Sequence, residues 1–300
     1  MPRIAPLLAC ALLLAPAPAL SEDDPTSLRD CRALLKSVQG EVTRTPETLA
    51  EDVPGGCRFT HVGYALDGFV EYRADEVTLL TPDLLAEFPS GDIFKSADLS
   101  IRGLRILPNT GNPMGDYLTS QFTSAIDIDL VYDTDPEALT AQLKRFSFDA
   151  GEIGRLTLFA RFSNFDNTDI DYTGLGDEMG VIHELGLAIE DNGLLATYLL
   201  PLVVGGLPYD EDPRPVIAQT KTAISTAIRA LPESLISMVS AESLVRFVTA
   251  FPEAHGNWTL HFESEEGLAL SALDASSLDD LLALLSSDAS ISATADYRGP

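Results

Sequence analysis

Residues 155–163 read RLTLFARFS and residues 181–190 read VIHELGLAIE, and these two segments decide how we interpret the fold. In both segments apolar residues alternate with polar ones, which is typical of β-strands with one buried face. The expected apolar faces are Leu156, Leu158, Ala160 and Phe162 in the first segment and Val181, His183, Leu185, Leu187 and Ile189 in the second. We therefore expect a central pair of strands joined by the acidic loop 164–180.

An earlier segment reads as a strand with one acidic face. Residues 126–133 read IDIDLVYD, which again alternates between two faces. The acidic outer face consists of Asp127, Asp129 and Asp133. Asp135-Pro136 then predicts a short helix that continues through Leu143, because a proline fits the first helical position after a capping aspartate.

After Asn192-Gly193 the pattern changes from strand to helix. An apolar run occupies residues 194–204, and helical spacing of apolar residues follows in 213–231 and 233–251. Trp258 then begins another alternating segment. The sequence therefore predicts an α+β fold with a large, mostly antiparallel, curved sheet and helices inserted after residue 193.

Residues 1–19 have the layout of a cleaved export signal. Arg3 precedes an apolar stretch, and Ala17-Pro18-Ala19 provides an A-x-A cleavage site. No later segment has the roughly 18 uninterrupted apolar residues of a membrane helix. We expect a periplasmic or secreted protein without a transmembrane segment after cleavage. Residues 20–300 would form a single α+β domain, with two halves, 20–150 and 151–300, as the alternative.

The cysteines predict one disulfide bond. Cleavage of the signal removes Cys10 and leaves Cys31 and Cys57, for which only one pairing exists in an exported chain. Helical spacing after Asp24-Pro25 places Cys31 on an N-terminal helix, which the bond would staple to the first strand of the sheet. Two free buried thiols or a metal-binding pair are the alternatives, and a lipoprotein signal ending at Cys10 is a further one.

The charge balance excludes some partners. The formal net charge is −27, and it becomes −28 when Arg3 leaves with the signal. Such a surface repels nucleic acid and anionic membranes and keeps a protein monomeric and soluble. We therefore expect a monomer that does not bind nucleic acid, and a protein partner would have to be basic.

The usual catalytic signatures are absent from the sequence. It contains no G-x-S-x-G elbow, no H-E-x-x-H helix, no phosphate-binding glycine loop and no dinucleotide fingerprint. The four histidines are far apart in the chain. They are His61, His183, His255 and His261. We therefore predict no catalytic residues and no cofactor, and expect that the protein is not an enzyme.

The loop 164–180 contains part of a calcium-binding pattern. Oxygen donors stand at positions 1, 3, 5 and 9 of such a loop, and a glycine stands at position 6. These donors are Asp169, Asp171, Thr173 and Asp177. Position 12, which should carry a bidentate acid, is Gly180. A solvated loop between two strands is therefore the favoured interpretation, and calcium binding is the alternative.

The C-terminal half resembles bacterial envelope proteins of the broad AsmA-like group. A strand ends in Asp191-Asn192-Gly193-Leu194, helices follow up to Phe251-Pro252, and a strand resumes at Gly256-Asn257-Trp258-Thr259-Leu260. The resemblance implies a β-rich fold and an envelope role that involves lipids, and it implies no catalytic residues. Members commonly begin with a membrane anchor, whereas this chain begins with a cleavable signal.

These observations lead to three functional hypotheses. The first is an exported, non-catalytic protein for envelope maintenance or for binding a lipid-like ligand on a partly open apolar sheet face. The alternative is an acidic protein-interaction or assembly factor with a basic partner. The third is an unrecognised hydrolase. If helices 213–251 cover the apolar face completely, that face is an ordinary core and the first hypothesis loses its site.

Overall fold

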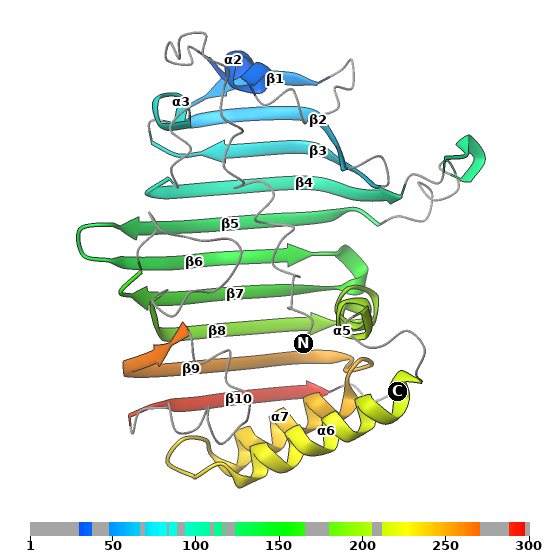
Figure 1. The fold of residues 1–300 in the computed structure, drawn as a ribbon, viewed down its shortest axis with the longest axis vertical. Coiled ribbons are helices and arrows are strands. Elements are labelled where there is room, and N and C mark those ends of the chain that lie inside the picture. Colours follow the sequence, from blue (N-terminus) through cyan, green and yellow to red (C-terminus); the bar gives the residue numbers. More distant parts are fainter. Residues whose placement is uncertain are drawn as a thin grey trace. The chain divides into compact units, whose positions relative to one another are not determined.

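A computed structural model shows a ten-stranded antiparallel sheet in which the strands follow one another in sequence order, β1 to β10 (Figure 1). The residues described are 30–37, 48–66, 70–82, 84–88, 94–108, 111–115, 117, 124–165, 180–205, 212–270 and 288–297. The α+β, mostly antiparallel character predicted from the sequence is confirmed.

Each strand is hydrogen-bonded to the strands that precede and follow it in the sequence. Their bounds are β1 Leu49–Val53, β2 Gly56–Leu66, β3 Val70–Leu80, β4 Ser96–Pro108, β5 Ile126–Asp135, β6 Thr140–Asp149, β7 Gly154–Ser163, β8 Val181–Asp191, β9 Gly256–Ala269 and β10 Ser290–Tyr297. The helices are α2 Cys31–Ser37, α3 Leu84–Glu87, the 3-10 turn η2 Gly151–Ile153, the π-helical turn η3 Leu195–Leu199, α5 Leu200–Gly205, α6 Pro213–Ala230 and α7 Met238–Ala250.

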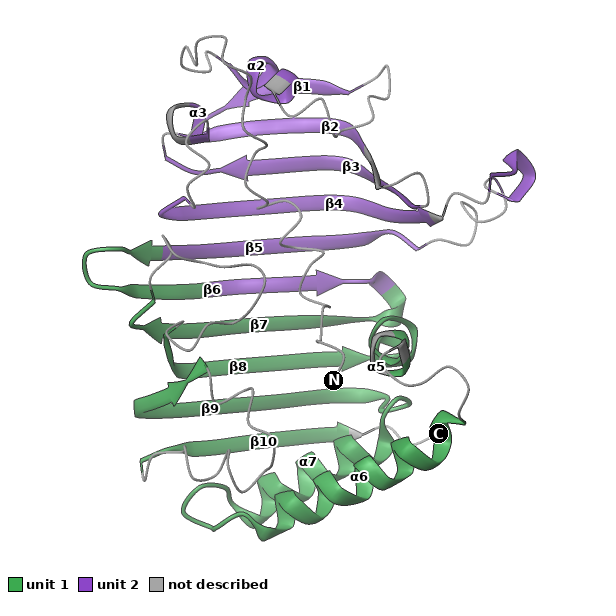
Figure 2. Cartoon of the chain, viewed as in Figure 1, with its two compact units in different colours: residues 1–12, 134–143, 152–300 green, residues 13–133, 144–151 purple. Residues whose placement is uncertain are grey.

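The chain divides into two compact units (Figure 2). Unit 1 comprises residues 1–12, 134–143 and 152–300, and unit 2 comprises residues 13–133 and 144–151. Strands β1 to β4 therefore belong to unit 2, whereas β7 to β10 and helices α5 to α7 belong to unit 1.

In unit 2, the sulfur atoms of Cys31 and Cys57 lie 1.93 Å apart, the distance of a disulfide bond. The predicted pairing is confirmed, and it connects α2 to β2. The sequence predicted a bond to the first strand of the sheet, but β1 precedes β2 and pairs with it. Both cysteines are buried in a small apolar cluster. The other buried members are Leu34, Leu84 and Phe94. The carboxylate of Asp52 lies beside the two sulfurs and accepts a hydrogen bond from the backbone N–H of Cys31 at 2.9 Å.

The acidic outer face of β5 is matched by donors on the neighbouring strands. Asp129 accepts a hydrogen bond from Arg102 at 2.6 Å, and this contact raises the pKa of the guanidinium above its ordinary value. Asp127 accepts from the backbone N–H of Gly103 at 2.8 Å, in the β-bulge of β4. Lys144 of β6 lies 2.5 Å from Asp133. The predicted acidic face is therefore largely compensated within unit 2.

The helix predicted from Asp135-Pro136 is wrong. Residues 136–139 form a turn between β5 and β6, and β6 begins at Thr140. The carboxylate of Asp135 accepts hydrogen bonds from the backbone N–H groups of Glu137 and Ala138, at 3.0 and 3.1 Å. An aspartate that bonds its own backbone two and three residues ahead serves a turn as well as a helix start, and here the hairpin pairing decides between the two.

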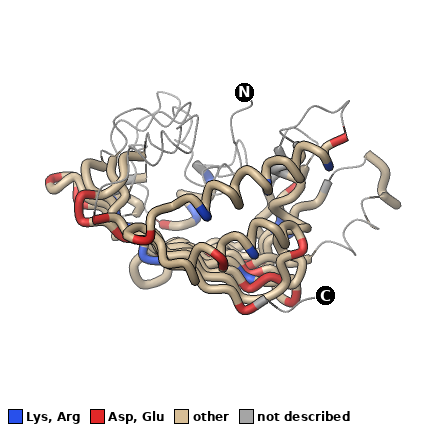
Figure 3. The backbone as a smooth tube through the Cα atoms, turned by 90° about the horizontal axis from the view of Figure 1, so that it is seen from below, with Lys and Arg blue, Asp and Glu red and all other residues tan. Residues whose placement is uncertain are grey.

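In unit 1, the two long helices form layers over one face of the sheet. Helix α7 packs on β10, and α6 packs on α7 (Figure 1). Seen from below, helices lie on one side of the strands (Figure 3). Lys221 of α6 donates hydrogen bonds to the carbonyls of Thr249, at 3.0 Å, and Phe251. These carbonyls lie at the C-terminal end of α7, where a cation is favoured by the helix dipole. Within the described ranges, no helix combines the length and apolar character needed to cross a membrane.

Candidate functional site

Strands β7, β8 and β9 of unit 1 carry an apolar face of three parallel rows. The central row is Leu158, Leu187 and Leu260, which lie opposite one another in the antiparallel register. The rows on either side are Leu156, Ile189 and Trp258, and Ala160, Leu185 and Phe262. Because alternate residues of a strand share a face, all nine side chains point to the same side of the sheet.

Burial differs among these rows. Ile189 and Trp258 in one flanking row are buried, and so are Ala160 and Phe262 in the other. All three leucines of the central row are only half-buried. The helices of unit 1 therefore cover this apolar face in part.

Regular alternation predicted the wrong face for the residues at the start of β8. A bulge between Ile182 and Glu184 shifts the alternation, so that Ile182 pairs with Phe162 and is buried in the core, 5 % exposed. Val181 and His183 consequently leave the face shared by Leu185, Leu187 and Ile189. A bulge adds one residue to a strand and reverses the facing of all residues beyond it, which regular alternation does not reveal.

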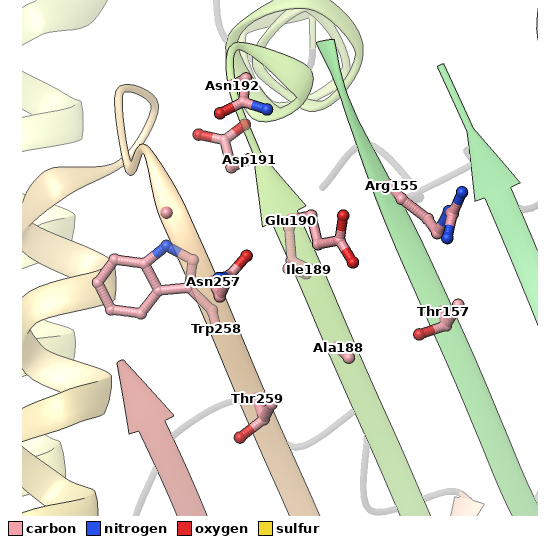
Figure 4. Close-up of a pocket in the computed structure, with 11 residues that line it drawn as sticks. Arg155, Thr157, Ala188, Ile189, Glu190, Asp191, Asn192, Asn257, Trp258 and Thr259 are labelled. Atoms are coloured by element: carbon pink, nitrogen blue, oxygen red, sulfur yellow. The ribbon is translucent and has the colours of Figure 1, made fainter. Parts of the chain in front are cut away.

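A polar pocket of about 460 Å³ lies on the opposite face of the same three strands (Figure 4). Two rows of side chains line it, and in each row the three residues are cross-strand neighbours. The rows are Arg155, Glu190 and Asn257, and Thr157, Ala188 and Thr259. These groups offer both hydrogen-bond donors and acceptors, so the pocket suits a small polar group rather than an acyl chain.

Asp191 is a fully buried acid at the end of β8, with a side-chain exposure of 0 %. Its Oδ1 accepts hydrogen bonds from the backbone N–H groups of Gly193, at 3.2 Å, and Leu195, at 3.0 Å. Within the described part of the chain its Oδ2 has no hydrogen-bond partner, and Nδ1 of His255 lies 3.8 Å away. Asp191 therefore fixes the start of the helical turn η3 through one oxygen alone.

We expect different results from two replacements of Asp191. Asp191→Ala removes the acceptor of both N–H groups and should lower the free energy of unfolding by about 1–2 kcal/mol, as for other helix caps. Asp191→Asn keeps an oxygen acceptor and removes a buried charge, so its stability should stay within about 1 kcal/mol of the wild type. Urea denaturation measures both values. Equal losses in the two variants would contradict this account and would show that the charge itself is needed.

The structure gives each histidine a separate environment. His61 lies on β2 in unit 2, with a positive φ of 55°. His255 neighbours Asp191, as described above. His261 of β9 lies with Nε2 3.2 Å from the carboxylate of Glu184.

His183 forms a pair with Ser163, which was not predicted from the sequence. Nε2 of His183 lies 2.7 Å from Oγ of Ser163, at the adjoining ends of β8 and β7. Nδ1 of His183 lies 3.3 Å from the backbone carbonyl oxygen of Ser264 on β9. The two side chains are 20 residues apart in the chain, and the bulge that brings them together has no sequence signature.

The sequence left two metal sites open as alternatives. The calcium candidates Asp169, Asp171, Thr173 and Asp177 lie outside the described residues. Cys31, Cys57 and Asp52 have ligand atoms within 4.8 Å of one another. Because the two sulfurs are at bonding distance, neither is a thiolate available to a metal ion.

Comparison with known proteins adds no relative to these observations. No family model, no curated protein and no solved structure matches the chain.

Proposed function

We propose that this chain is an exported protein of the bacterial envelope that binds a lipid-like ligand on the apolar face of β7, β8 and β9. The expected export signal and the cysteine pair at disulfide distance support an oxidising compartment outside the cytoplasm. In this proposal, the curvature expected of the sheet and the helices inserted after residue 193 frame the ligand.

The observation that carries the proposal is the central row of leucines. Leu158, Leu187 and Leu260 stand in register on three strands, and all three are half-buried. Each of the two flanking rows contains two buried residues. Contact with a hydrocarbon chain would remove the rest of their surface from water, at roughly 25 cal/mol for each Å². The pocket on the other face is lined by two rows that include charged and hydroxyl side chains, which suit a hydrocarbon chain less well.

The alternative role, an acidic surface that recruits a basic protein, rests on the net charge of −27. The acidic face that the sequence indicated most clearly lies on β5, and there Asp129 and Asp133 already contact Arg102 and Lys144. A basic partner would have to displace these cations. Ligand binding is therefore the better-supported role.

Titration with a fluorescent fatty acid tests the proposed site. We expect saturable binding to the wild type and at least about tenfold weaker binding to Leu187→Gln, since a buried leucine contributes about 1.5–3 kcal/mol and 1.4 kcal/mol corresponds to tenfold. The polar glutamine occupies the middle of the central row, where any bound chain has to pass.

Val239→Gln provides the matched control. Val239 is 78 % exposed on α7, so this variant makes the same kind of polar change on an exposed apolar residue away from the rows. It should bind as the wild type does. Fluorescence of Trp258, the chain's single tryptophan, reports whether each variant is folded. Absence of saturable binding to the wild type, or equal binding by folded Leu187→Gln, would refute the proposed site.

A further inference from the structure

The Ser163–His183 pair lies away from the apolar rows, in a stretch of irregular backbone. The register of β8 shifts on both sides of His183, towards β7 and towards β9. Asn164, directly after Ser163, has a positive φ of 51°, and Gly180 has a φ of 106°. Positive φ at a residue other than glycine is uncommon and is concentrated at functional sites.

The hydrogen bonds of the ring define its tautomer. The group that faces Nδ1 is the carbonyl oxygen of Ser264, which can only accept. In the neutral ring, Nδ1 therefore carries the proton, and Nε2 is left with a lone pair. That lone pair accepts the hydroxyl proton of Ser163 at 2.7 Å. This is the arrangement in which a histidine acts as the general base of a serine nucleophile.

The carbonyl that orients the ring is itself held in place. Ser264 is 2 % exposed, and its hydroxyl lies 3.3 Å from both carboxylate oxygens of Asp288. Asp288 also accepts hydrogen bonds from the backbone N–H groups of Glu265 and Glu266. Gly267 N–H donates to the Ser264 hydroxyl at 2.8 Å. Ser264 and Asp288 are thus positioning residues, which act on the pair through the orientation of His183.

We propose that Ser163 is a nucleophile activated by His183, and that the pair cleaves carboxylic esters. Oγ of Ser163 attacks the ester carbonyl carbon while its proton passes to Nε2 of His183. The bond to the alcohol oxygen then breaks, and the departing alkoxide takes that proton. Water attacks the acyl-serine in the same way, releases the carboxylic acid and restores Ser163.

The orienting group limits the substrate class. In the described part of the chain, Nδ1 faces a neutral carbonyl and not the carboxylate that stabilises an imidazolium in serine hydrolases. Without a carboxylate to stabilise the imidazolium, a substrate with a better leaving group is required, which favours esters over amides. Arg161 lies two positions before Ser163, on the polar face of β7, and forms a cross-strand ion pair with Glu184. Because alternate residues share a face, the ester would arrive from that face.

A fluorophosphonate probe tests the nucleophile directly. Incubation of the full mature protein with the probe, followed by intact mass and peptide mapping, should give one adduct, located on Ser163. Ser163→Ala should give none at this position. His183→Gln should form the adduct at least about tenfold more slowly, because general-base assistance contributes 10²–10⁴-fold in efficient sites.

His261→Gln is the matched control, because it replaces a histidine of the neighbouring strand and leaves Ser163 and His183 in place. It should be labelled at the wild-type rate, and Trp258 fluorescence checks that both histidine variants are folded. Failure of Ser163 to react, or equal labelling rates in wild type and folded His183→Gln, overturns this inference. Because the leucine rows lie on the other face, either result leaves the fatty-acid test independent.

Discussion

Replacing Gly154 by alanine is expected to lower the free energy of unfolding by about 3–5 kcal/mol, from backbone strain and from overpacking together. Gly154 opens β7 with a φ of 139°, a conformation that residues with a Cβ rarely adopt. A Cβ there would lie 2.0 Å from the carbonyl oxygen of Glu190. That oxygen belongs to the backbone of β8, which is paired on both sides and cannot move alone.

Gly151→Ala is the control for Gly154→Ala. Gly151 also has a positive φ, of 64°, but a Cβ there would meet no atom within 4 Å. Gly151→Ala should therefore lower the free energy of unfolding only by the strain of the left-handed conformation, about 1–2 kcal/mol. Urea denaturation followed by Trp258 fluorescence measures both. Equal losses would contradict the steric account and would mean that β8 yields at Glu190.

Loss of the cysteine pair is expected to have the second large effect. The double variant Cys31→Ser/Cys57→Ser should lose about 3 kcal/mol of stability, the loop-closure value for a separation of this size. The two residues are 26 positions apart and join α2 to β2 in unit 2. Without the bond, the seven-residue helix α2 keeps its contacts in a small apolar cluster and the hydrogen bond from the Cys31 N–H to Asp52.

Denaturation followed by far-UV circular dichroism measures this effect. A reducing agent should destabilise the wild type to the level of the double variant and should leave the double variant unchanged. If reduction has no effect on the wild type, the cysteines do not form the bond that their distance indicates.

Regular alternation predicted the strands well, because it follows directly from the geometry of a half-buried strand. The segment expected at 155–163 is β7, Gly154–Ser163, and the segment expected at 181–190 is β8, Val181–Asp191. Prediction failed where the pattern is interrupted. The bulge near His183 reverses the facing of Ile182, and a single sequence contains no mark of it.

Local signals also failed where tertiary pairing decides between two structures. Asp135-Pro136 fits a helix start, but the pairing of β5 with β6 makes it a hairpin turn. The Ser163–His183 pair was not predicted. Its residues lie on two different strands, and the Ser264 carbonyl that faces the His183 ring is 81 residues from His183 in sequence. Such a cluster depends on strand register, which is a long-range property.

The partial burial of Leu158, Leu187 and Leu260 could not be predicted from the sequence either. The sequence showed that helices follow β8, and it did not show how much of the apolar face they cover. In the structure α7 packs on β10 and α6 packs on α7, so the outer helix adds little cover to β7 and β8. The coverage therefore depends on helix layering rather than on the amount of apolar surface in the helices.

Native mass spectrometry of the protein purified from its own cells distinguishes the lipid-binding role from the interaction role. We expect a population heavier than the mature chain by the mass of one lipid, which collisional activation removes and which Leu187→Gln lacks. A bare chain mass for the wild type, together with specific capture of a basic protein, would refute the lipid-binding role and favour the interaction role.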